Sequence, residues 1–175
     1  MTDKTPIVLF ESKEKCCACG ACMNICPKQA ITMVEDEYGF LYPQIDKEKC
    51  VGCGACKKVC AYQNQTEENK PVDTYAAINK DDNQKLLSAS GGLFAAFATK
   101  VINEGGVVFG CSLDKIDCKL VPHHVAIDNI SNLSKLQGSK YVQSSTEHTY
   151  KAVLEYLKAG KLVLYSGTPC QIASL

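Results

Sequence analysis

Residues 16–27 of the chain read CCACGACMNICP, and residues 50–61 read CVGCGACKKVCA. Four cysteines in each stretch follow the spacing C-x2-C-x2-C-x3-C, so one pattern occurs twice. A pattern that recurs in this way indicates an internal duplication, here of a loop followed by a short helix. The eight cysteines of the pattern are Cys16, Cys19, Cys22, Cys26, Cys50, Cys53, Cys56 and Cys60.

This spacing is typical of bacterial two-cluster ferredoxins, which bind 4Fe–4S cubes. Small residues such as Gly20 and Gly54 would let the backbone approach the inorganic sulfides. The last cysteine of each run is expected to open a short helix and to point at the other cluster. We therefore predict one cluster on Cys16, Cys19, Cys22 and Cys60, and a second on Cys50, Cys53, Cys56 and Cys26. Two clusters in one small fold imply one-electron transfer.

Zinc and disulfide bonds are the alternatives for so many cysteines. Structural zinc sites usually use two C-x2-C pairs, or one pair with histidines, separated by a longer loop. Each run here has three cysteines at two-residue gaps and then a fourth. Disulfides need an oxidising compartment, and the apolar run at residues 7–10 is too short for the core of a secretion signal. The pattern therefore favours iron–sulfur clusters in a reducing cytoplasm.

The composition of the 175-residue chain restricts its function class. Its basic residues are 19 lysines, which balance 19 acidic residues, and the sequence contains no arginine. Scattered lysines argue against a nucleic-acid groove, which depends on bidentate guanidinium contacts. No stretch approaches the length of a transmembrane helix. We therefore expect neither nucleic-acid binding nor an integral membrane segment.

The spacing of apolar and turn residues predicts two domains joined by a linker. The cysteine runs and a hairpin between them, with strands over 31–34 and 38–42, define an α+β ferredoxin-like two-cluster domain at residues 10–62. Residues 63–73, QNQTEENKPVD, are polar and contain a proline, as in a linker. Residues 74–175 alternate predicted strands and helices, which indicates an α/β domain with a mostly parallel sheet.

The predicted elements of the α/β domain follow from its apolar periodicity. Strands are expected at residues 74–79, 107–113, 118–127 and 162–167. A helix at residues 93–104 should bury Leu93, Phe94, Phe97, Val101 and Ile102. A second helix at 144–161, capped by Ser145 or Thr146, should bury Tyr150, Val153, Leu154 and Leu157. Because residues 168–175 only begin a further helix, we expect an incomplete domain that is truncated or completed by another chain.

Three segments of the α/β domain carry residue types that bind ligands. Ser90, Gly91 and Gly92 precede the first helix, where free N–H groups attract phosphate. A later loop supplies Gly138, Ser139, Lys140 and Tyr141. The carboxyl end of the last strand, where ligands bind in open α/β sheets, supplies Ser166, Gly167, Thr168, Pro169, Cys170 and Gln171. Taken singly, the first two segments also have an ordinary interpretation as a helix cap and a surface loop.

Taken together, these segments resemble the coenzyme F420 hydrogenase/dehydrogenase beta subunit family. The similarity covers residues 12–175 and rests on SGG, GSKYVQS and GTPCQIA following a two-cluster module. The resemblance implies an FAD on the α/β domain that exchanges electrons with the clusters, and substrates that include the deazaflavin coenzyme and chlorophyll-type pigments. A flavin accepts a hydride as two electrons, whereas a cluster moves one, so the pair would convert between the two. Lys140 and Cys170 are the candidate catalytic residues.

Four cysteines lie outside the cluster pattern. Cys17 is interpreted as a bystander beside a ligand, and Cys111 and Cys118 as small buried residues of strands. Cys170 lies at a predicted helix start, which lowers thiol pKa values, so it is a candidate for a role at the flavin or at an extra metal centre. The adjacent His123 and His124 should point to opposite faces of a strand, so that at most one belongs to a site.

The sequence thus favours an iron–sulfur flavin-dependent oxidoreductase that acts on a small-molecule substrate. Its expected partners are a redox partner protein or ferredoxin, and a further subunit. Two alternatives stay open: a ferredoxin-type electron carrier without flavin, and a truncated fragment without catalytic activity. Flavin released from the anaerobically purified chain would distinguish the first hypothesis from the other two.

Overall fold

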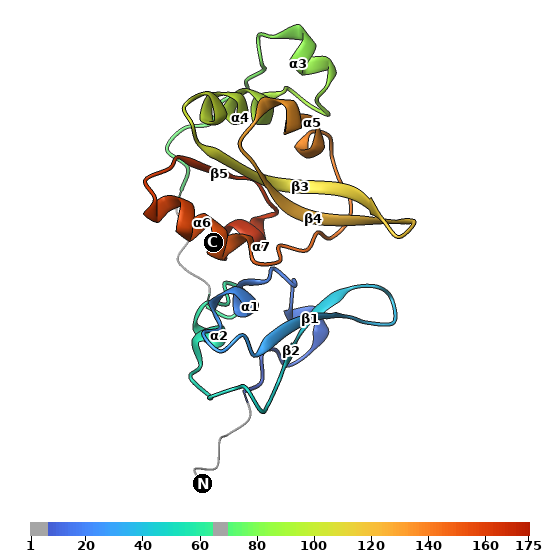
Figure 1. The fold of residues 1–175 in the computed structure, drawn as a ribbon, viewed down its shortest axis with the longest axis vertical. Helices are drawn as coiled ribbons and strands as arrows, with labels where there is room; N and C mark the ends of the chain where they lie inside the picture. The colour runs from blue at the N-terminus through green and yellow to red at the C-terminus, as the bar shows by residue number, and fades with distance from the viewer. Residues whose placement is uncertain (1–6, 65–69) are drawn as a thin grey trace. The chain divides into compact units, whose positions relative to one another are not determined.

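The computed structural model describes residues 7–64 and 70–175 and divides the chain into two compact units (Figure 1). Unit 1 comprises residues 1–66, 145–150 and 168–175, and unit 2 comprises residues 67–144 and 151–167. Of the predicted linker, residues 65–69 lie outside the described residues. Two segments that the sequence placed in the α/β domain, residues 145–150 and 168–175, therefore belong to the cysteine-rich unit.

Unit 1 is built from short elements around a two-stranded antiparallel hairpin. Its elements are η1 (Lys13–Lys15), α1 (Ala21–Ile25), β1 (Ile31–Glu35), β2 (Leu41–Ile45), α2 (Ala55–Lys58) and α7 (Pro169–Ile172). The hairpin agrees with the sequence prediction, although its turn is longer. Asp36 organises that turn, because its Oδ1 accepts hydrogen bonds from the backbone N–H groups of Tyr38 and Phe40, both at 3.0 Å.

The short helices of unit 1 begin before the third cysteine of each run, and not at the fourth as predicted. α1 and α2 contain the third cysteine of their runs, Cys22 and Cys56, and end before the fourth cysteine instead of starting at it. Gly20 and Gly54 precede these helices with φ values of 80° and 75°. This left-handed conformation suits glycine because it has no Cβ. Each run is thus a loop, a glycine, about one helical turn and a final cysteine.

The sheet of unit 2 is mixed, so the prediction of a mostly parallel sheet is wrong. Its strands are β3 (Val107–Ile116), β4 (Lys119–Ile127) and β5 (Val163–Tyr165), in the order β4-β3-β5. β3 pairs antiparallel with β4 and parallel with β5. The cause is a two-residue turn: Asp117 and Cys118 both have positive φ, which joins adjacent strands as a hairpin. Cys118 is therefore exposed in a turn, not buried in a strand.

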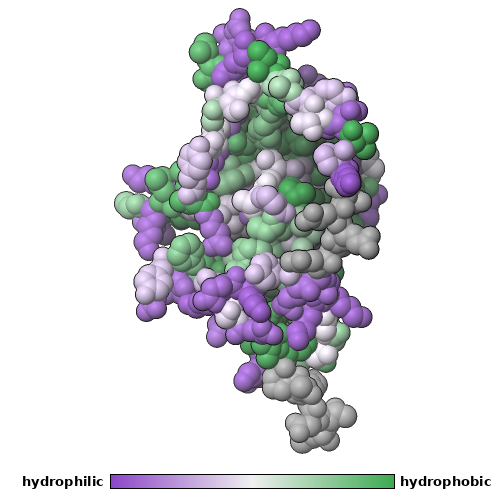
Figure 2. All heavy atoms as spheres, turned by 180° about the vertical axis from the view of Figure 1, so that it is seen from behind, coloured by the Kyte–Doolittle hydropathy of each residue, from purple (hydrophilic) through white to green (hydrophobic). Residues whose placement is uncertain are grey.

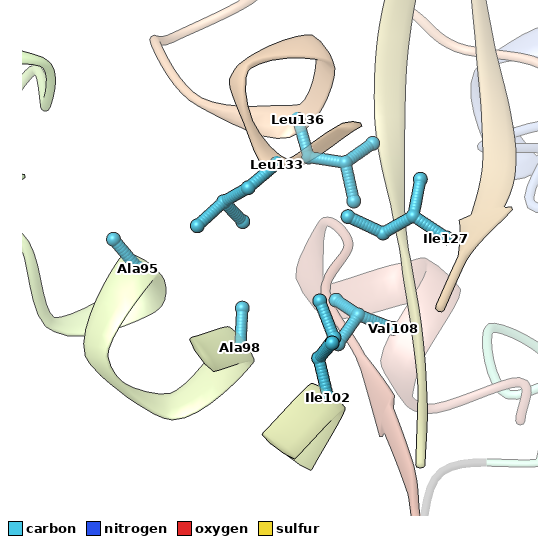
Figure 3. Packing of buried hydrophobic residues seen from close by; sticks show 7 residues of the cluster. All are labelled: Ala95, Ala98, Ile102, Val108, Ile127, Leu133 and Leu136. Atoms are coloured by element: carbon cyan, nitrogen blue, oxygen red, sulfur yellow. The ribbon is translucent and has the colours of Figure 1, made fainter. Parts of the chain in front are cut away.

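The helices of unit 2 are α3 (Asp82–Leu86), α4 (Leu93–Asn103), η2 (Ile130–Asn132), α5 (Leu133–Leu136) and α6 (Thr149–Lys158), which begins in unit 1. Of these, α4 and α5 cover one face of strand β3 and α6 covers the other. On one face α4 and α5 surround a cluster with β3 and β4 (Figure 3), formed by Ala95, Ala98, Ile102, Val108, Ile127, Leu133 and Leu136. On the other face Val107 and Phe109 pack against Val153 of α6.

The buried face of α4 agrees in part with the predicted one. Ile102 is buried and Phe94 and Val101 pack against the same cluster, as predicted, whereas Leu93 and Phe97 are exposed. Ala95 and Ala98, which were not among the predicted residues, are almost fully buried. In α6, Tyr150 and Val153 are buried as predicted, but Leu154 and Leu157 are exposed.

Two further predicted elements are changed. Residues 74–79, expected as a strand, have no regular secondary structure, and Asn79 instead donates its backbone N–H to Gly91 O at 2.7 Å. Helix α6 begins at Thr149, after Glu147 with a φ of 45°, and not at residue 144.

The surface of the protein includes apolar side chains (green in Figure 2). Among the described helices, none has the length and apolarity needed to cross a membrane.

Candidate functional site

Five predicted ligands from both cysteine runs line one cavity of about 300 Å³ within unit 1, here called cavity one. They are Cys16, Cys19, Cys22 and Cys60, together with Cys56, which also lines a second cavity. Ala18 and Gly20, with φ values of 49° and 80°, bend the first run into a loop around it. α1 packs against α2, which brings Cys60, just after α2, to the first run. The fourth cysteine of the second run thus lies with the first three cysteines of the first.

Four predicted ligands line a second, smaller cavity of unit 1, here called cavity two. They are Cys26, Cys50, Cys53 and Cys56, of which Cys56 also lines cavity one. Cys26 lies at the end of α1, and its Sγ accepts a hydrogen bond from the backbone N–H of Ala30 at 3.3 Å. The grouping is again three cysteines of one run with the fourth of the other.

Several thiols of these cavities are partly or fully buried, which makes their ionisation less favourable. Burial raises the pKa of Cys22 to about 12, and it also raises the pKa values of Cys16 and Cys56. Backbone N–H groups aimed at the sulfurs act in the opposite direction, from Ala18 on Cys16 and from Met23 on Cys22. Thiolates therefore become favourable here only when a positive group replaces the protons, as iron does.

The donor set fits a bulky cluster. The cysteines of the pattern surround two cavities, and backbone N–H groups point at the sulfurs of Cys16, Cys22 and Cys26. Cysteine sulfurs that accept N–H hydrogen bonds are the environment in which 4Fe–4S cubes are held and their potentials set.

Residues 145–150 and 168–175 cover the first run at Cys19. The carbonyl oxygen of Cys19 accepts hydrogen bonds from Tyr150 Oη at 2.9 Å and from Thr146 Oγ1 at 3.1 Å. Asn24 of α1 donates its Nδ2 to Glu147 O at 2.7 Å. Tyr150 also lies 3.1 Å from Gln171 O, which ties the two covering segments together. Backbone groups of the first ligand loop are thus satisfied by residues more than 120 positions along the chain.

Ser174 reaches the sulfur of Cys19 itself. Its Oγ lies 3.1 Å from Cys19 Sγ and 2.7 Å from the carbonyl oxygen of Cys170, so one hydroxyl proton is shared between two acceptors. Ser174 is buried. When iron makes Cys19 a thiolate, the sulfur becomes the stronger acceptor. Sequence reasoning missed Thr146, Tyr150 and Ser174 as site residues, since only the GTPCQIA motif pointed to this neighbourhood.

Close approach explains the glycine of the first run. A Cβ at Gly20 would overlap Thr146 Oγ1, so no larger residue fits while Thr146 holds the Cys19 carbonyl. The sequence had assigned Gly20 and Gly54 to the approach of inorganic sulfide. At Gly54 a Cβ would have no atom within 4 Å. Both glycines have a left-handed backbone conformation, but only at Gly20 does a neighbouring side chain leave no space for a Cβ.

Two further cysteines, Cys17 and Cys170, line cavity one. Burial of the thiol and the nearby Cys170 sulfur, to which it is hydrogen-bonded, raise the pKa of Cys17 to about 12. Cys170 Sγ lies 3.1 Å from Thr168 Oγ1. Cys17 is therefore no isolated bystander, and Cys170, predicted for a flavin site, lies with the first cysteine run.

The three predicted ligand-binding segments meet only in part, in a cavity of about 370 Å³ within unit 2. The cavity is lined by residues 88–94, Gly138, Ser139 and Ser166, with Ala77, Leu136 and Gln137. Residues 168–171 belong instead to unit 1. Lys140 donates to the carbonyl oxygens of Lys135 and Gln137 at the end of α5, and Tyr141 is 94% exposed. Neither residue lines this cavity.

The glycines before α4 have a packing role. A Cβ at Gly91 would lie 3.0 Å from Ala77 O, and one at Gly92 would lie 3.1 Å from Asn79 Cβ. Their small size therefore admits residues 77–79, and a phosphate beside these glycines stays a prediction. Gly138 has a φ of 78°, and a Cβ there would have no atom within 4 Å, so this glycine faces open space at the cavity.

The two histidines of β4 point to opposite faces, as predicted. His123 Nε2 lies 2.8 Å from Asp114 Oδ2, and His124 is buried with Nε2 3.0 Å from Ser166 O. His124 Nδ1 lies 3.2 Å from Ser144 Oγ, and its ring stacks on Tyr165. These contacts tie β4 to the segments on either side of α6.

Comparison with known proteins agrees with the geometry of unit 1. No curated protein matches the chain. Residues 15–64 match the family model described as a 4Fe-4S dicluster domain. This range contains all eight cysteines of the duplicated pattern. The chain therefore carries, near its N-terminus, a 4Fe–4S dicluster domain that transfers electrons through its clusters.

Proposed function

We propose that the chain is an iron–sulfur flavoprotein oxidoreductase, or a subunit of one. Cluster one is held by Cys16, Cys19, Cys22 and Cys60, and cluster two by Cys26, Cys50, Cys53 and Cys56. Both exchange electrons one at a time with an FAD on unit 2. The flavin then oxidises or reduces a small molecule, of which a deazaflavin coenzyme is the leading class, and a cytoplasmic redox protein or ferredoxin is the electron partner.

One observation carries the flavin part of the proposal: residues 88–94, 138–139 and Ser166, distant in sequence, line a single cavity. Its volume of about 370 Å³ falls in the range of roughly 300–1,000 Å³ typical of cofactor pockets. Leu93, Phe94 and Leu136 give it an apolar wall, while serines and backbone groups give polar contacts. Such a mixture suits a flavin, which has an apolar ring and polar edges.

The test is the flavin content of the anaerobically purified chain. We expect flavin to be released on denaturation, and we expect Ser139→Trp, which places a large ring at the exposed cavity wall, to lower the flavin-to-iron ratio several-fold. Ser134→Trp is the matched control, because Ser134 is a residue of α5 that does not line the cavity. Equal flavin content in both variants would remove this cavity from the site.

The alternative function is that of a ferredoxin-type electron carrier without flavin. It is favoured by the family match, which covers residues 15–64 alone. A chain that contains iron but releases no flavin, and that binds none when FAD or FMN is added during refolding or reconstitution, would support this alternative.

A further inference from the structure

Cys17 and Cys170 form a pair of thiols that the two clusters do not use. Neither belongs to the duplicated ligand pattern, yet both line cavity one beside Cys16, Cys19, Cys22 and Cys60. The two side chains are hydrogen-bonded to each other, although they come from opposite ends of unit 1.

The backbone on both sides of the pair is fixed. Cys17 follows a predicted cluster ligand directly and precedes Ala18, whose φ of 49° marks a tight bend. On the other side, the Thr168 side chain and the buried Gln171 form a capping box around Cys170, and Gln171 Oε1 accepts the Thr168 N–H at 2.9 Å. Two thiols that line one cavity on segments with a defined backbone are placed where a disulfide, which tolerates little freedom in geometry, could form.

The pair is also accessible. Cys17 is exposed and Cys170 is half-buried, whereas the thiols of structural disulfides are usually enclosed. Exposed disulfides are the ones that take part in redox reactions. The Ser174 hydroxyl, which contacts Cys19 Sγ, also donates to the carbonyl oxygen of Cys170. One side chain thus connects the turn that carries Cys170 to a sulfur of the proposed cluster one.

We propose that Cys17 and Cys170 are a redox-active dithiol–disulfide couple that exchanges electrons with cluster one. In the reducing direction the Cys17–Cys170 S–S bond breaks, accepting two electrons and two protons to give two thiols. The electrons come one at a time from a low-potential one-electron donor through the clusters, and the protons come from water. In the oxidising direction a disulfide substrate accepts the electron pair by thiol–disulfide exchange, which leaves the internal disulfide and two product thiols.

The stoichiometry is consistent, because two clusters together store two electrons and one disulfide consumes two. The proposal rests on the clusters and does not require a flavin. Its failure is therefore distinguishable from failure of the flavin proposal, which is read from released flavin.

The test uses the full chain, purified anaerobically with both clusters and freed of any flavin. The chain is incubated with excess bis(2-hydroxyethyl) disulfide, separated from it, quenched in acid, alkylated and digested. We expect a disulfide-linked peptide pair containing Cys17 and Cys170. Titration of the oxidised chain with reduced methyl viologen should then consume two electrons more than the untreated chain, with loss of that linkage.

Cys170→Ser and Cys118→Ser are the matched variants, since Cys118 is an exposed thiol in the β3–β4 turn. Cys170→Ser should abolish the two additional electrons, and Cys118→Ser should retain them. The iron content of each variant shows whether its clusters are intact. If a variant loses iron, the proposal is judged from the linked peptides and the electron count of the unmodified chain. The proposal is overturned if both thiols remain alkylatable after oxidation, or if the disulfide persists while the clusters are reduced.

Discussion

The two cysteine runs share one spacing but have different surroundings. In the first run, the carbonyl of Cys19 accepts hydrogen bonds from Tyr150 and Thr146, and Ser174 contacts its sulfur. The equivalent residue of the second run, Cys53, is exposed. The spacing determines how a run wraps a cluster, whereas distant segments determine how much hydrogen bonding and solvent that cluster meets. Duplicated ligand sets can therefore hold two clusters of unequal potential.

The largest expected effect comes from removing the ligand that links the runs. The parent chain should contain about eight iron atoms. Cys60→Ser should lose about half of this iron and give the same low-temperature electron paramagnetic resonance spectrum as Cys16→Ser, because both variants lack cluster one. Likewise, the spectrum of Cys26→Ser should be the same as that of Cys53→Ser, because both variants lack cluster two. A Cys60→Ser spectrum that matches Cys53→Ser would refute the crossed assignment.

The next effect separates the two αL glycines. Gly20→Ala and Gly54→Ala both place a Cβ in the left-handed region, at a cost of about 1–2 kcal/mol. Only Gly20→Ala also drives a Cβ into Thr146 Oγ1. We expect the denaturant midpoint for cluster bleaching, measured anaerobically by visible absorption, to fall clearly further for Gly20→Ala.

The double variant Gly20→Ala/Thr146→Ala is the control for this clash. It should recover part of the difference, because the atom that the new Cβ would meet is removed while the strained φ remains. Equal midpoints for Gly20→Ala and Gly54→Ala would mean that Thr146 does not approach the first run closely.

A smaller effect is expected on potential. Ser174→Ala removes the hydroxyl beside Cys19 Sγ, which stabilises the additional negative charge of the reduced cluster. The potential of cluster one should become more negative, while that of cluster two stays the same. Redox titration followed by electron paramagnetic resonance measures both, with Ser134→Ala as the control. A shift in cluster two alone would contradict the covering role of residues 168–175.

The smallest effect concerns the hairpin between the runs. The Lys13 ammonium, 2.7 Å from Asp36 Oδ2, and the N–H groups of Phe40 and Tyr38 hold the pKa of Asp36 below its ordinary value. A lowered pKa in the folded state means that this contribution is present above the unfolded pKa and is lost as pH falls through the folded one.

Between pH 5 and 8, amide exchange at Tyr38 and Phe40, corrected for its intrinsic rate, should therefore not depend on pH. Asp36→Asn should speed this exchange modestly over the same range. Asp46→Asn, before the second run, is the comparison, since backbone N–H groups of Glu48 and Lys49 anchor that carboxylate. A marked pH dependence above pH 5 in the parent chain would contradict a lowered pKa at Asp36.

Local patterns in the sequence predicted the parts of the molecule that depend on local geometry. The cysteine spacing predicted the 4Fe–4S dicluster domain, and the sequence between the two runs predicted the hairpin, although β2 begins at Leu41 instead of residue 38. The β3–β4 turn was missed because Asp117 and Cys118 are not the glycine or asparagine that usually indicate positive φ. The predicted strand at 74–79 failed because its short apolar run has no partner strand in unit 2 among the described residues.

The surroundings of the ligands depend on long-range packing, which no local pattern reports. The sequence predicted Thr146 as a helix cap and Tyr150 as a buried helix residue. Tyr150 lies in the first turn of α6 and Thr146 precedes it, yet the hydroxyls of both residues donate hydrogen bonds to the carbonyl oxygen of Cys19. Similarly, Gly91 and Gly92 suggested a phosphate site, but their small size admits residues 77–79. The glycines indicated that another group approaches the backbone closely at these positions, and the fold identifies that group as residues 77–79.

The contact between Ser174 and Cys19 spans 155 residues of sequence, and this has a consequence during synthesis. At a translation rate of about 5–20 residues per second, Cys19 is made roughly 8 to 31 seconds before Ser174. Throughout that interval Cys19 is open to iron–sulfur donors and equally to oxidants. The late arrival of the covering segments leaves time for cluster insertion first and protection afterwards.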